Sequence, residues 1–250
     1  MKIGIVTGAS SGMGREFVRQ ISKDFSSLDE IWVIARRIDR LNELQKELKD
    51  VYIRPIKSDI TTDEINIIKE NLEKYRPYVK ILVNSAGMGM IGHFDELSME
   101  DNLNMVSLNC MALTKITKFC LPYMKANSVI INLASSAAFL PQPSFAIYAA
   151  TKSFVYSFSM ALSKELANKK IRVCAVCPGP VSTEFFDKAE KYSKIKVYKK
   201  LFQSKPENVV KRAIIDVRRN KKVSIYGPLM NIFRVLCKIL PHGFIIKFIK

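Results

Sequence analysis

Near its start the chain reads Lys2-Ile3-Gly4-Ile5-Val6-Thr7-Gly8-Ala9-Ser10-Ser11-Gly12-Met13-Gly14, a short apolar run that leads into a glycine-rich turn. A helical pattern follows over residues 14–25. Glycines between a strand and a helix let the backbone approach a pyrophosphate, whose charge is held by N–H groups and the helix dipole. The context therefore predicts a dinucleotide-binding loop, which a glycine triplet alone would not. The contacts expected from this loop are Gly8, Ser10, Ser11, Gly12, Met13 and Gly14.

Beyond this unit, short apolar runs alternate with helix-length amphipathic segments. The runs are almost wholly apolar, as expected for parallel strands covered by helices on both faces. Strands are predicted at residues 2–7, 30–35, 51–57, 81–84, 128–134, 171–177 and 223–226, and helices at 14–25, 38–48, 63–75, 111–124 and 148–168. This pattern predicts the α/β class, with a Rossmann-type doubly wound parallel sheet of about seven strands. Ligands are then expected beyond the carboxyl ends of the strands.

Length and composition indicate one folded domain over residues 1–250. The chain is 48% hydrophobic and 25% charged, which is ordinary for a globular protein with a large core. The start of the chain lacks the uninterrupted apolar region of a signal peptide, so we expect a cytoplasmic protein.

The five cysteines favour a reducing compartment, since the count is odd. Cys174 and Cys177 form a C-x-x-C, but they lie in an apolar run that reads as a buried strand. A zinc site needs two more ligands, and the sequence offers no second Cys/His pair. We therefore expect buried thiols and no metal.

Basic residues are concentrated in the last quarter of the chain. The formal net charge is +17; residues 188–250 contain 17 basic and three acidic residues, so they carry +14 of it. Such a segment suggests an anionic partner: acidic lipid, nucleic acid or an acidic substrate. No nucleic-acid recognition motif accompanies the charge, so we expect no nucleic-acid role.

The end of the second predicted strand bears on cofactor choice. NAD-binding folds usually place an acidic residue there, on the ribose hydroxyl. This chain has Ala35-Arg36-Arg37 instead, and two guanidiniums can clamp a 2′-phosphate. Arg15 could add to that pocket. The sequence therefore favours NADPH over NADH, although a solvated basic turn is the plainer alternative.

Tyr148 and Lys152 form a Y-x-x-x-K at the start of a predicted helix. Residues four apart share a helix face, so the ammonium should lie near the phenol. A neighbouring cation favours the phenolate and is expected to lower the tyrosine pKa from about 10. Alone the pattern is common and usually marks a surface tyrosine, so the sequence segments that occur with it decide its meaning. They are Asn84-Ser85-Ala86-Gly87, Ser107-Leu108-Asn109, Asn132-Leu133-Ala134-Ser135-Ser136 and Pro178-Gly179-Pro180-Val181-Ser182-Thr183.

Together these segments resemble the short-chain dehydrogenase/reductase family in its single-domain form, over residues 3 to about 185. The resemblance implies that Tyr148 gives its proton to a carbonyl oxygen while hydride arrives from the nicotinamide. Ser135 would orient the carbonyl. Lys152 would lower the tyrosine pKa and bind the nicotinamide ribose, and Asn109 would hold a water linked to Lys152.

The same resemblance supplies the remaining cofactor contacts. Asp59 would contact the adenine, and Thr183 would lie near the carboxamide. The other implied contacts are Ile60, Asn84, Ala86, Gly87, Pro178, Gly179 and Val181. Asn84-Ser85-Ala86-Gly87 departs mildly from the commoner Asn-Asn-Ala-Gly of the family.

Residues 184–204 lie where these enzymes place a substrate lid. The segment contains Phe185-Phe186, Tyr192, Tyr198 and Phe202 among many lysines. These aromatics could line a bulky apolar pocket, which would suit a steroid or a long-chain ketoacyl compound. The alternative is a lid that packs on its own body.

Residues 229–250 form a basic amphipathic tail. On a helix over 229–240, Asn231, Arg234 and Lys238 share one stripe and the other positions are apolar. The run is too short and too charged to span a bilayer but could lie in a membrane interface. Alternatively, the tail docks on the body or across a dimer interface. Similar tails occur in family members that act on steroids and long-chain ketoacyl substrates.

The sequence thus predicts an NADPH-dependent oxidoreductase that reduces a ketone or aldehyde, or runs in reverse on an alcohol. The second hypothesis is a non-catalytic protein that has the same fold and senses the redox state of the dinucleotide. A third, an adaptor for anionic surfaces, rests on the tail alone. Family resemblance implies a homodimer or homotetramer. The particular substrate, its stereochemistry and the physiological direction are not encoded in these motifs.

Overall fold

The computed structural model describes residues 1–25, 27–193 and 203–247. Its centre is one seven-stranded sheet, all parallel, with strand order β3-β2-β1-β4-β5-β6-β7. The strands are β1 (Lys2–Thr7), β2 (Glu30–Ala35), β3 (Tyr52–Lys57), β4 (Tyr78–Asn84), β5 (Val129–Leu133), β6 (Arg172–Val176) and β7 (Val223–Ser224). The predicted α/β class and doubly wound parallel sheet are confirmed.

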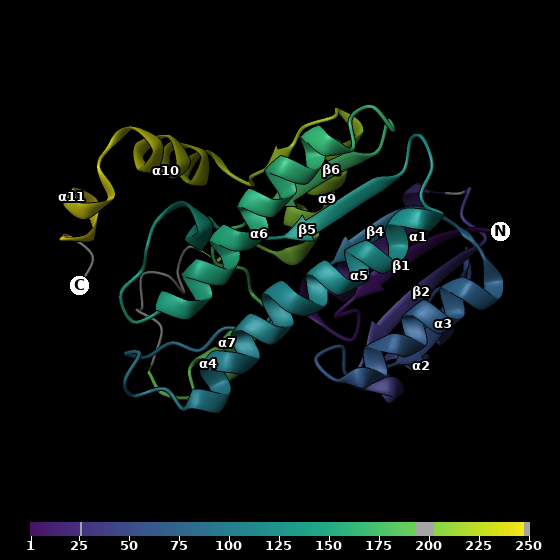
Figure 1. Cartoon of the computed structure of the whole chain (residues 1–250), viewed down its shortest axis with the longest axis horizontal. Coiled ribbons are helices and arrows are strands. Elements are labelled where there is room, and N and C mark those ends of the chain that lie inside the picture. Colours follow the sequence, from purple (N-terminus) through teal and green to yellow (C-terminus); the bar gives the residue numbers. More distant parts are fainter. Residues whose placement is uncertain (26, 194–202, 248–250) are drawn as a thin grey trace.

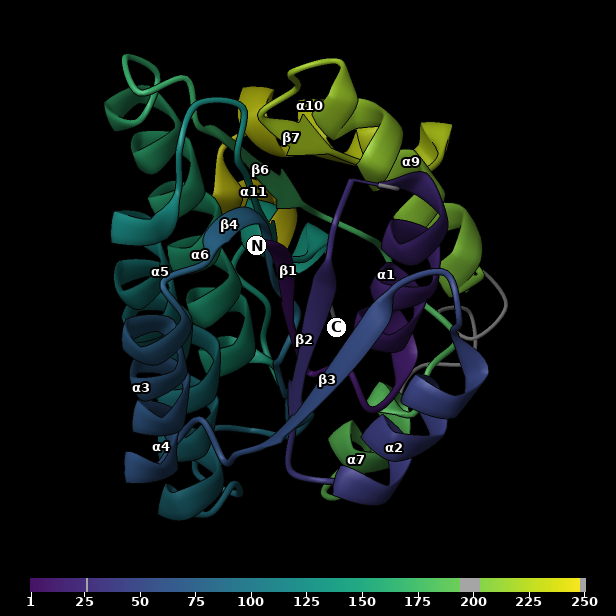
Figure 2. The same ribbon diagram turned by 90° about the vertical axis from the view of Figure 1, so that its right-hand side faces the viewer.

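Helices cover both faces of this sheet (Figures 1 and 2). One face carries α1 (Gly12–Asp24), α2 (Ile38–Glu47) and α9 (Pro206–Arg218). The other carries α3 (Asn66–Tyr75), α5 (Leu113–Cys120) and α6 (Ala146–Glu165). The remaining helices are α4 (Met99–Val106), α7 (Phe185–Ala189), α10 (Pro228–Ile239) and α11 (His242–Ile246), with the single turns η1 (Asp63–Ile65), η3 (Leu121–Tyr123) and η4 (Ser136–Phe139) and the π-helical η2 (Ser107–Ala112).

Alternate residues of each strand point to opposite faces of the sheet, and each face has its own apolar core. Val6 and Val33 are paired on β1 and β2 and face α1, while the adjacent Ile5 and Trp32 face α3. Both faces are therefore apolar, and the strands read as continuous apolar runs in the sequence.

The strand order reverses between β1 and β4, and connections leave the sheet there in opposite directions. This switch point at the carboxyl ends of the strands is where doubly wound sheets bind ligands. The five cysteines are unpaired and four are buried, including Cys174 and Cys177. No helix within the described residues is long and apolar enough to cross a bilayer.

Candidate active site

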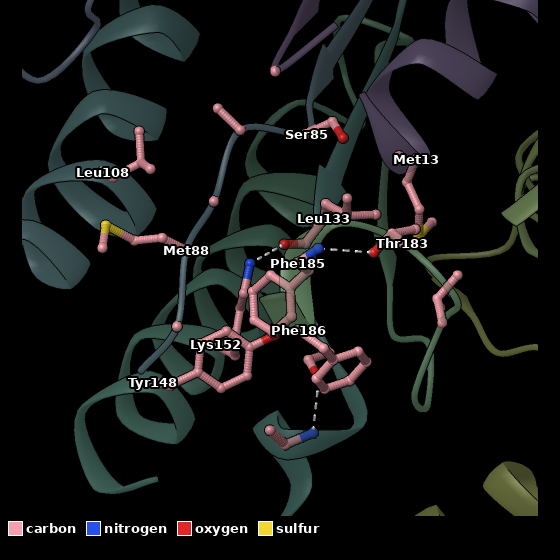
Figure 3. A pocket seen from close by; sticks show the side chains of 18 of the residues that line it. Met13, Ser85, Met88, Leu108, Leu133, Tyr148, Lys152, Thr183, Phe185 and Phe186 are labelled. Atoms are coloured by element: carbon pink, nitrogen blue, oxygen red, sulfur yellow. Dashed lines mark hydrogen bonds between the residues drawn. The ribbon is translucent and has the colours of Figure 1, made fainter. Parts of the chain in front are cut away.

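A cavity of about 1020 Å³ lies at this switch point. It is at the upper end of the size range of small-molecule sites. The predicted site residues that line it are Gly8, Ser10, Ser11, Gly12, Met13, Gly14, Arg36, Arg37, Asp59, Ile60, Ala86, Gly87, Ser135, Tyr148, Lys152, Pro178, Gly179, Val181 and Thr183. Segments far apart in the sequence thus meet around one space (Figure 3).

The glycine-rich loop is shaped for a close approach. Gly8 has φ +67°, and a Cβ on it would lie 2.8 Å from the Cα of Ala86. A Cβ on Gly14 would clash with the carbonyl oxygen of Gly8. No side chain caps the start of α1, and its first turn has no acidic residue. Its N–H groups are therefore suited to an anion, and the loop fits the pyrophosphate of a dinucleotide.

Arginines lie at the β2 end of the cavity. The Arg37 guanidinium donates to the Ser11 hydroxyl at 2.8 Å, and it also contacts Ser10 and Glu184. Glu184 pairs with Arg40 as well. The hydrogen bond from Arg40, followed by the one from Arg37, keeps the pKa of this carboxyl below its usual value. Arg36 is 68% exposed and lies 3.5 Å from Asp59. This end of the cavity combines two arginines, Arg36 and Arg37, with the carboxylates of Asp59 and Glu184, and Glu184 also pairs with Arg40 behind the wall.

Arg15 does not join this group. Its guanidinium turns to α2, where it lies 3.0 Å from Glu47 and 3.5 Å from Glu43. These carboxylates hold it away from the cavity, which it does not line.

Tyr148 is nearly buried on the first turn of α6. Its ring stacks on Phe145, with 4.2 Å between centroids, and touches Phe185 of α7 at 5.5 Å. Burial raises the pKa of Tyr148 to about 12, against the opposing effect of a hydrogen bond with the Ser135 hydroxyl. The phenol therefore holds its proton over the whole physiological range and is suited to donate it.

Lys152 lies one turn further along α6, on the same face, as expected (Figure 3). Its ammonium donates to the Leu133 carbonyl at 2.7 Å and lies 5.6 Å from the Tyr148 ring centroid. Burial lowers the pKa of Lys152 to about 8. The sequence led us to expect that this cation lowers the tyrosine pKa. In the structure desolvation outweighs any such effect, because both groups are withdrawn from water.

Asn109 and Asn84 lie behind the cavity wall and do not line it. Asn109, on η2, donates to the Met88 carbonyl at 2.8 Å and to the Thr151 hydroxyl at 3.0 Å, and it accepts from the Met88 N–H. Asn84 donates to Asn132 on β5 and to Thr117 on α5. Asn109 thus fixes the backbone at Met88, and Asn84 links β4 to β5 and α5.

Other residues at the site were not predicted. Phe145 and Glu184 touch predicted residues, and α10 contributes Leu229, Met230 and Phe233 to the wall. The apolar residues of α10 were visible in the sequence, but nothing there placed them on the wall of the cavity. Of the predicted lid, α7 brings Phe185 to the tyrosine; Tyr198 and Phe202 fall outside the described residues.

Comparisons with known proteins agree with this geometry. The family model for short chain dehydrogenase matches residues 2–194. An NADP-dependent 3-hydroxy acid dehydrogenase of Schizosaccharomyces pombe is 29% identical over 90% of this chain and 90% of its own. A very-long-chain 3-oxoacyl-CoA reductase of Mus musculus is 33% identical over 72% of this chain and 59% of its own.

Among solved structures, a short-chain dehydrogenase from Sphingobium yanoikuyae in complex with NADPH superimposes with a TM-score of 0.81 at 25% identity. The match covers 97% of this chain and 98% of that one. The chain belongs to the short-chain dehydrogenase/reductase family. It is an oxidoreductase that acts on CH–OH groups and binds NAD(H) or NADP(H).

Proposed function

We propose that this protein is an NADPH-dependent reductase of a ketone or aldehyde, with Tyr148 as the proton donor. The observation that carries the proposal is the meeting of Ser135, Tyr148 and Lys152 on one wall of a cavity whose opposite end is the glycine-rich loop. A cofactor whose pyrophosphate lies on α1 would extend along this cavity towards the tyrosine.

The chemistry needs a hydride for the carbonyl carbon and a proton for its oxygen. A bound dihydronicotinamide supplies the hydride. The protonated phenol of Tyr148 supplies the proton, and the Ser135 hydroxyl, already within hydrogen-bonding reach of the phenol, orients the carbonyl oxygen. The charged Lys152 stabilises the phenolate that remains. In the reverse direction Tyr148 accepts the proton of an alcohol.

The preference for NADPH is supported by Arg37. It lies against Ser10 and Ser11 at the end of β2, where an NAD-binding protein usually carries a carboxylate. A 2′-phosphate placed there would meet guanidinium groups that hydrogen-bond it bidentately. The yeast relative is named as NADP-dependent and the Sphingobium structure contains NADPH, which also supports this preference.

An apolar substrate is supported by the wall around Tyr148. Phe145, Phe185 and Met90 pack near the phenol, and α10 adds three further apolar side chains. The mouse relative is named for a very-long-chain 3-oxoacyl substrate. We therefore place the substrate among steroid-like or long-chain ketoacyl compounds.

The test is turnover with a matched variant. Purified protein with NADPH is assayed for loss of dihydronicotinamide absorbance against ketosteroids, 3-ketoacyl esters, quinones and small aldehydes. Tyr148→Phe is expected to lower kcat by about 10²- to 10⁴-fold while NADPH still binds, because the hydroxyl group that donates the proton is removed. Turnover that survives in Tyr148→Phe would refute the assignment of the proton donor.

The alternative is a protein that binds the dinucleotide without turning over a substrate. Tight NADPH binding with no turnover across the panel would favour it. Such a sensor gains nothing from a tyrosine hydrogen-bonded to Ser135 beside a buried lysine, and this arrangement is our reason for preferring the enzyme.

A further inference from the structure

The helix α10 carries apolar residues on two different faces. Met230, Phe233 and Cys237 face inward and pack on the core cluster that contains Val155 of α6. A second set is 46–71% exposed: Leu229, Ile232, Val235, Leu236 and Ile239. At 100° per residue this second set forms one continuous stripe, whose edge at Leu229 adjoins Phe233 of the inner face.

The stripe, named here the outer face of α10, is distinct from the polar stripe that the sequence predicted. Asn231, Arg234 and Lys238 occupy the third side of the helix. A helix that needed only to cover the core would be polar opposite its inner face. Large aliphatic side chains in water on five positions of a twelve-residue helix are a costly arrangement unless something covers them.

Charge indicates what covers it. Residues 227–250, which include α10 and α11, contain four basic residues and no acidic one. Lys238 and Lys247 are exposed on α10 and just after α11. Both helices lie at one end of the molecule, on the outside of the layered body (Figure 1). An apolar stripe bordered by cations on a peripheral helix matches the surface of a bilayer that contains anionic lipid.

The outer face is also next to the cavity. Leu229 is 55% exposed and lines the cavity, together with Met230 and Phe233. Met230 packs against the loop at the carboxyl end of β6, where a Cβ on Gly179 would lie 2.8 Å from its sulfur. The same helix thus presents one side to solvent and another to the cavity that Tyr148 also lines.

We propose that α10 docks its outer face on an anionic membrane surface and that the cavity receives a lipophilic carbonyl compound dissolved in that membrane. The second half rests on the proposed reductase function; the first does not. Partition into the interface would bring the cavity wall formed by Leu229 to the depth at which such a compound resides. This proposal narrows the substrate class to carbonyl compounds that are dissolved in a bilayer.

The experiment for docking is co-sedimentation of the full chain with vesicles of phosphatidylcholine, with and without phosphatidylserine. We expect binding to the anionic vesicles that weakens as salt is raised. The double variant Ile232→Asn/Ile239→Asn should lower the partition coefficient by at least roughly tenfold, because it removes two aliphatic side chains from the buried stripe. Tyr52→Asn/Ile67→Asn is the matched control, since both residues are exposed, Tyr52 on β3 at the opposite edge of the sheet from β7 and Ile67 on α3.

Sedimentation velocity without vesicles distinguishes a competing occupant. If Ile232→Asn/Ile239→Asn dissociates an oligomer and the wild type ignores anionic vesicles, the outer face binds a second copy and the proposal is overturned. Equal loss of vesicle binding in the control pair would also overturn the proposal, because non-specific hydrophobic adsorption would then explain the binding.

Substrate delivery is measured separately, with a ketone embedded in the vesicles. Wild-type turnover should be faster on anionic than on neutral vesicles, and Ile232→Asn/Ile239→Asn should lose this difference while its rate on a water-soluble ketone is unchanged. A wild type without the difference would overturn the delivery step. Tyr148→Phe should bind vesicles normally without turnover, so failure of the reductase function and failure of docking are told apart.

Discussion

At the scale of single residues, Tyr148 and Lys152 have opposite pKa shifts from one cause. Burial raises the pKa of Tyr148 to about 12 and lowers the pKa of Lys152 to about 8. Reduction needs the phenol protonated and the ammonium charged. The first condition holds at ordinary pH, and the second is met below about pH 8 and lost above it.

We therefore expect kcat/KM for reduction to be level on the acidic side and to fall as the pH rises through about 8, because this parameter reports the free enzyme. The measurement is a pH profile with NADPH affinity determined separately at each pH. In Lys152→Met the residual rate should no longer show this fall. A wild-type rate that increases from neutral pH to pH 9 would contradict the assignment.

Arg37 and Arg36 offer a matched pair for cofactor choice. Arg37 contacts both serines of the loop, whereas Arg36 is largely exposed beside Asp59. Arg37→Ala should weaken NADPH binding by about 10- to 100-fold, since charge-assisted hydrogen bonds contribute about 1.5–3 kcal/mol. NADH binding should be unchanged. Fluorescence titration of both cofactors checks this, with Arg36→Ala as the milder control; equal losses for NADH and NADPH would count against a 2′-phosphate role.

Local sequence singled out residues that the structure brings to one cavity, but it did not predict their partners. Tyr148, Lys152 and the glycine loop are recognisable because their geometry is set within one turn or one helix start. The neighbours of Arg37 include Glu184, which is 147 residues away in the sequence. Arg15 was expected at the cofactor and instead meets Glu43 and Glu47 on α2. Helix-to-helix ion pairs of this kind depend on packing angles that no local pattern encodes.

At the scale of elements, Glu184 joins the cofactor end of the cavity to α7. It immediately precedes Phe185, which contacts Tyr148, and its carboxylate binds Arg37 and Arg40. Glu184→Gln should tighten NADPH binding by about two- to fivefold, because it removes a partially exposed ion pair of about 0.2–1 kcal/mol that competes with a 2′-phosphate. NADH affinity is the internal control. Weaker NADPH binding would mean that Glu184 positions the arginines instead.

Asp216 connects α9 to β7, the shortest strand. Its buried carboxylate accepts from Ser224 at 3.0 Å and pairs with Arg212 at 2.8 Å and Lys221 at 3.0 Å. Burial alone would raise the pKa of Asp216, but Lys221, Arg212 and Ser224 together lower it. This carboxylate therefore stabilises the fold at neutral pH, and the contribution is lost as the pH falls from about 4 through the lowered folded-state value.

Asp216→Asn should reduce the free energy of unfolding by about 1–3 kcal/mol at neutral pH, with a smaller difference in acid. Thermal unfolding should shift by roughly 2–4 °C for each kcal/mol. Glu165→Gln, which neutralises an exposed carboxylate on α6, is the control and should change little. An unchanged melting curve for Asp216→Asn would show that the three partners do not stabilise the charge.

The elements were predictable where burial is continuous. β1 and β2 have their predicted bounds because both faces of each are apolar. β4 begins at Tyr78, earlier than expected, because the polar side chains of Tyr78 and Lys80 interrupt the apolar run while backbone pairing with β1 continues. β7 ends at Ser224; Ile225 and Tyr226 looked like strand, but pairing with β6 stops before them.

At the scale of the whole molecule, exposed apolar side chains gather on a second surface besides α10. Met99, Leu103 and Val106 recur along α4 at helical spacing, Met111 follows on η2, and Phe154 is exposed on α6. Asn109 of η2 is hydrogen-bonded to Thr151 of α6, so these helices are neighbours. A patch built from two adjoining helices can pack on its own copy about a twofold axis, as isologous interfaces do.

We therefore expect a homodimer through the α4–α6 surface, with α10 left free for the membrane. Leu103→Glu/Phe154→Glu should give a monomer in sedimentation velocity, because two like charges would face their copies across the axis in an apolar contact. Both side chains are exposed in the single chain, so the melting temperature of the monomer should stay close to that of Ile67→Glu, a control on α3. If the double variant still sediments as the wild type does, another surface holds the copies together. The outer face of α10, which also carries exposed apolar side chains, would then be the next surface to test as the contact between copies.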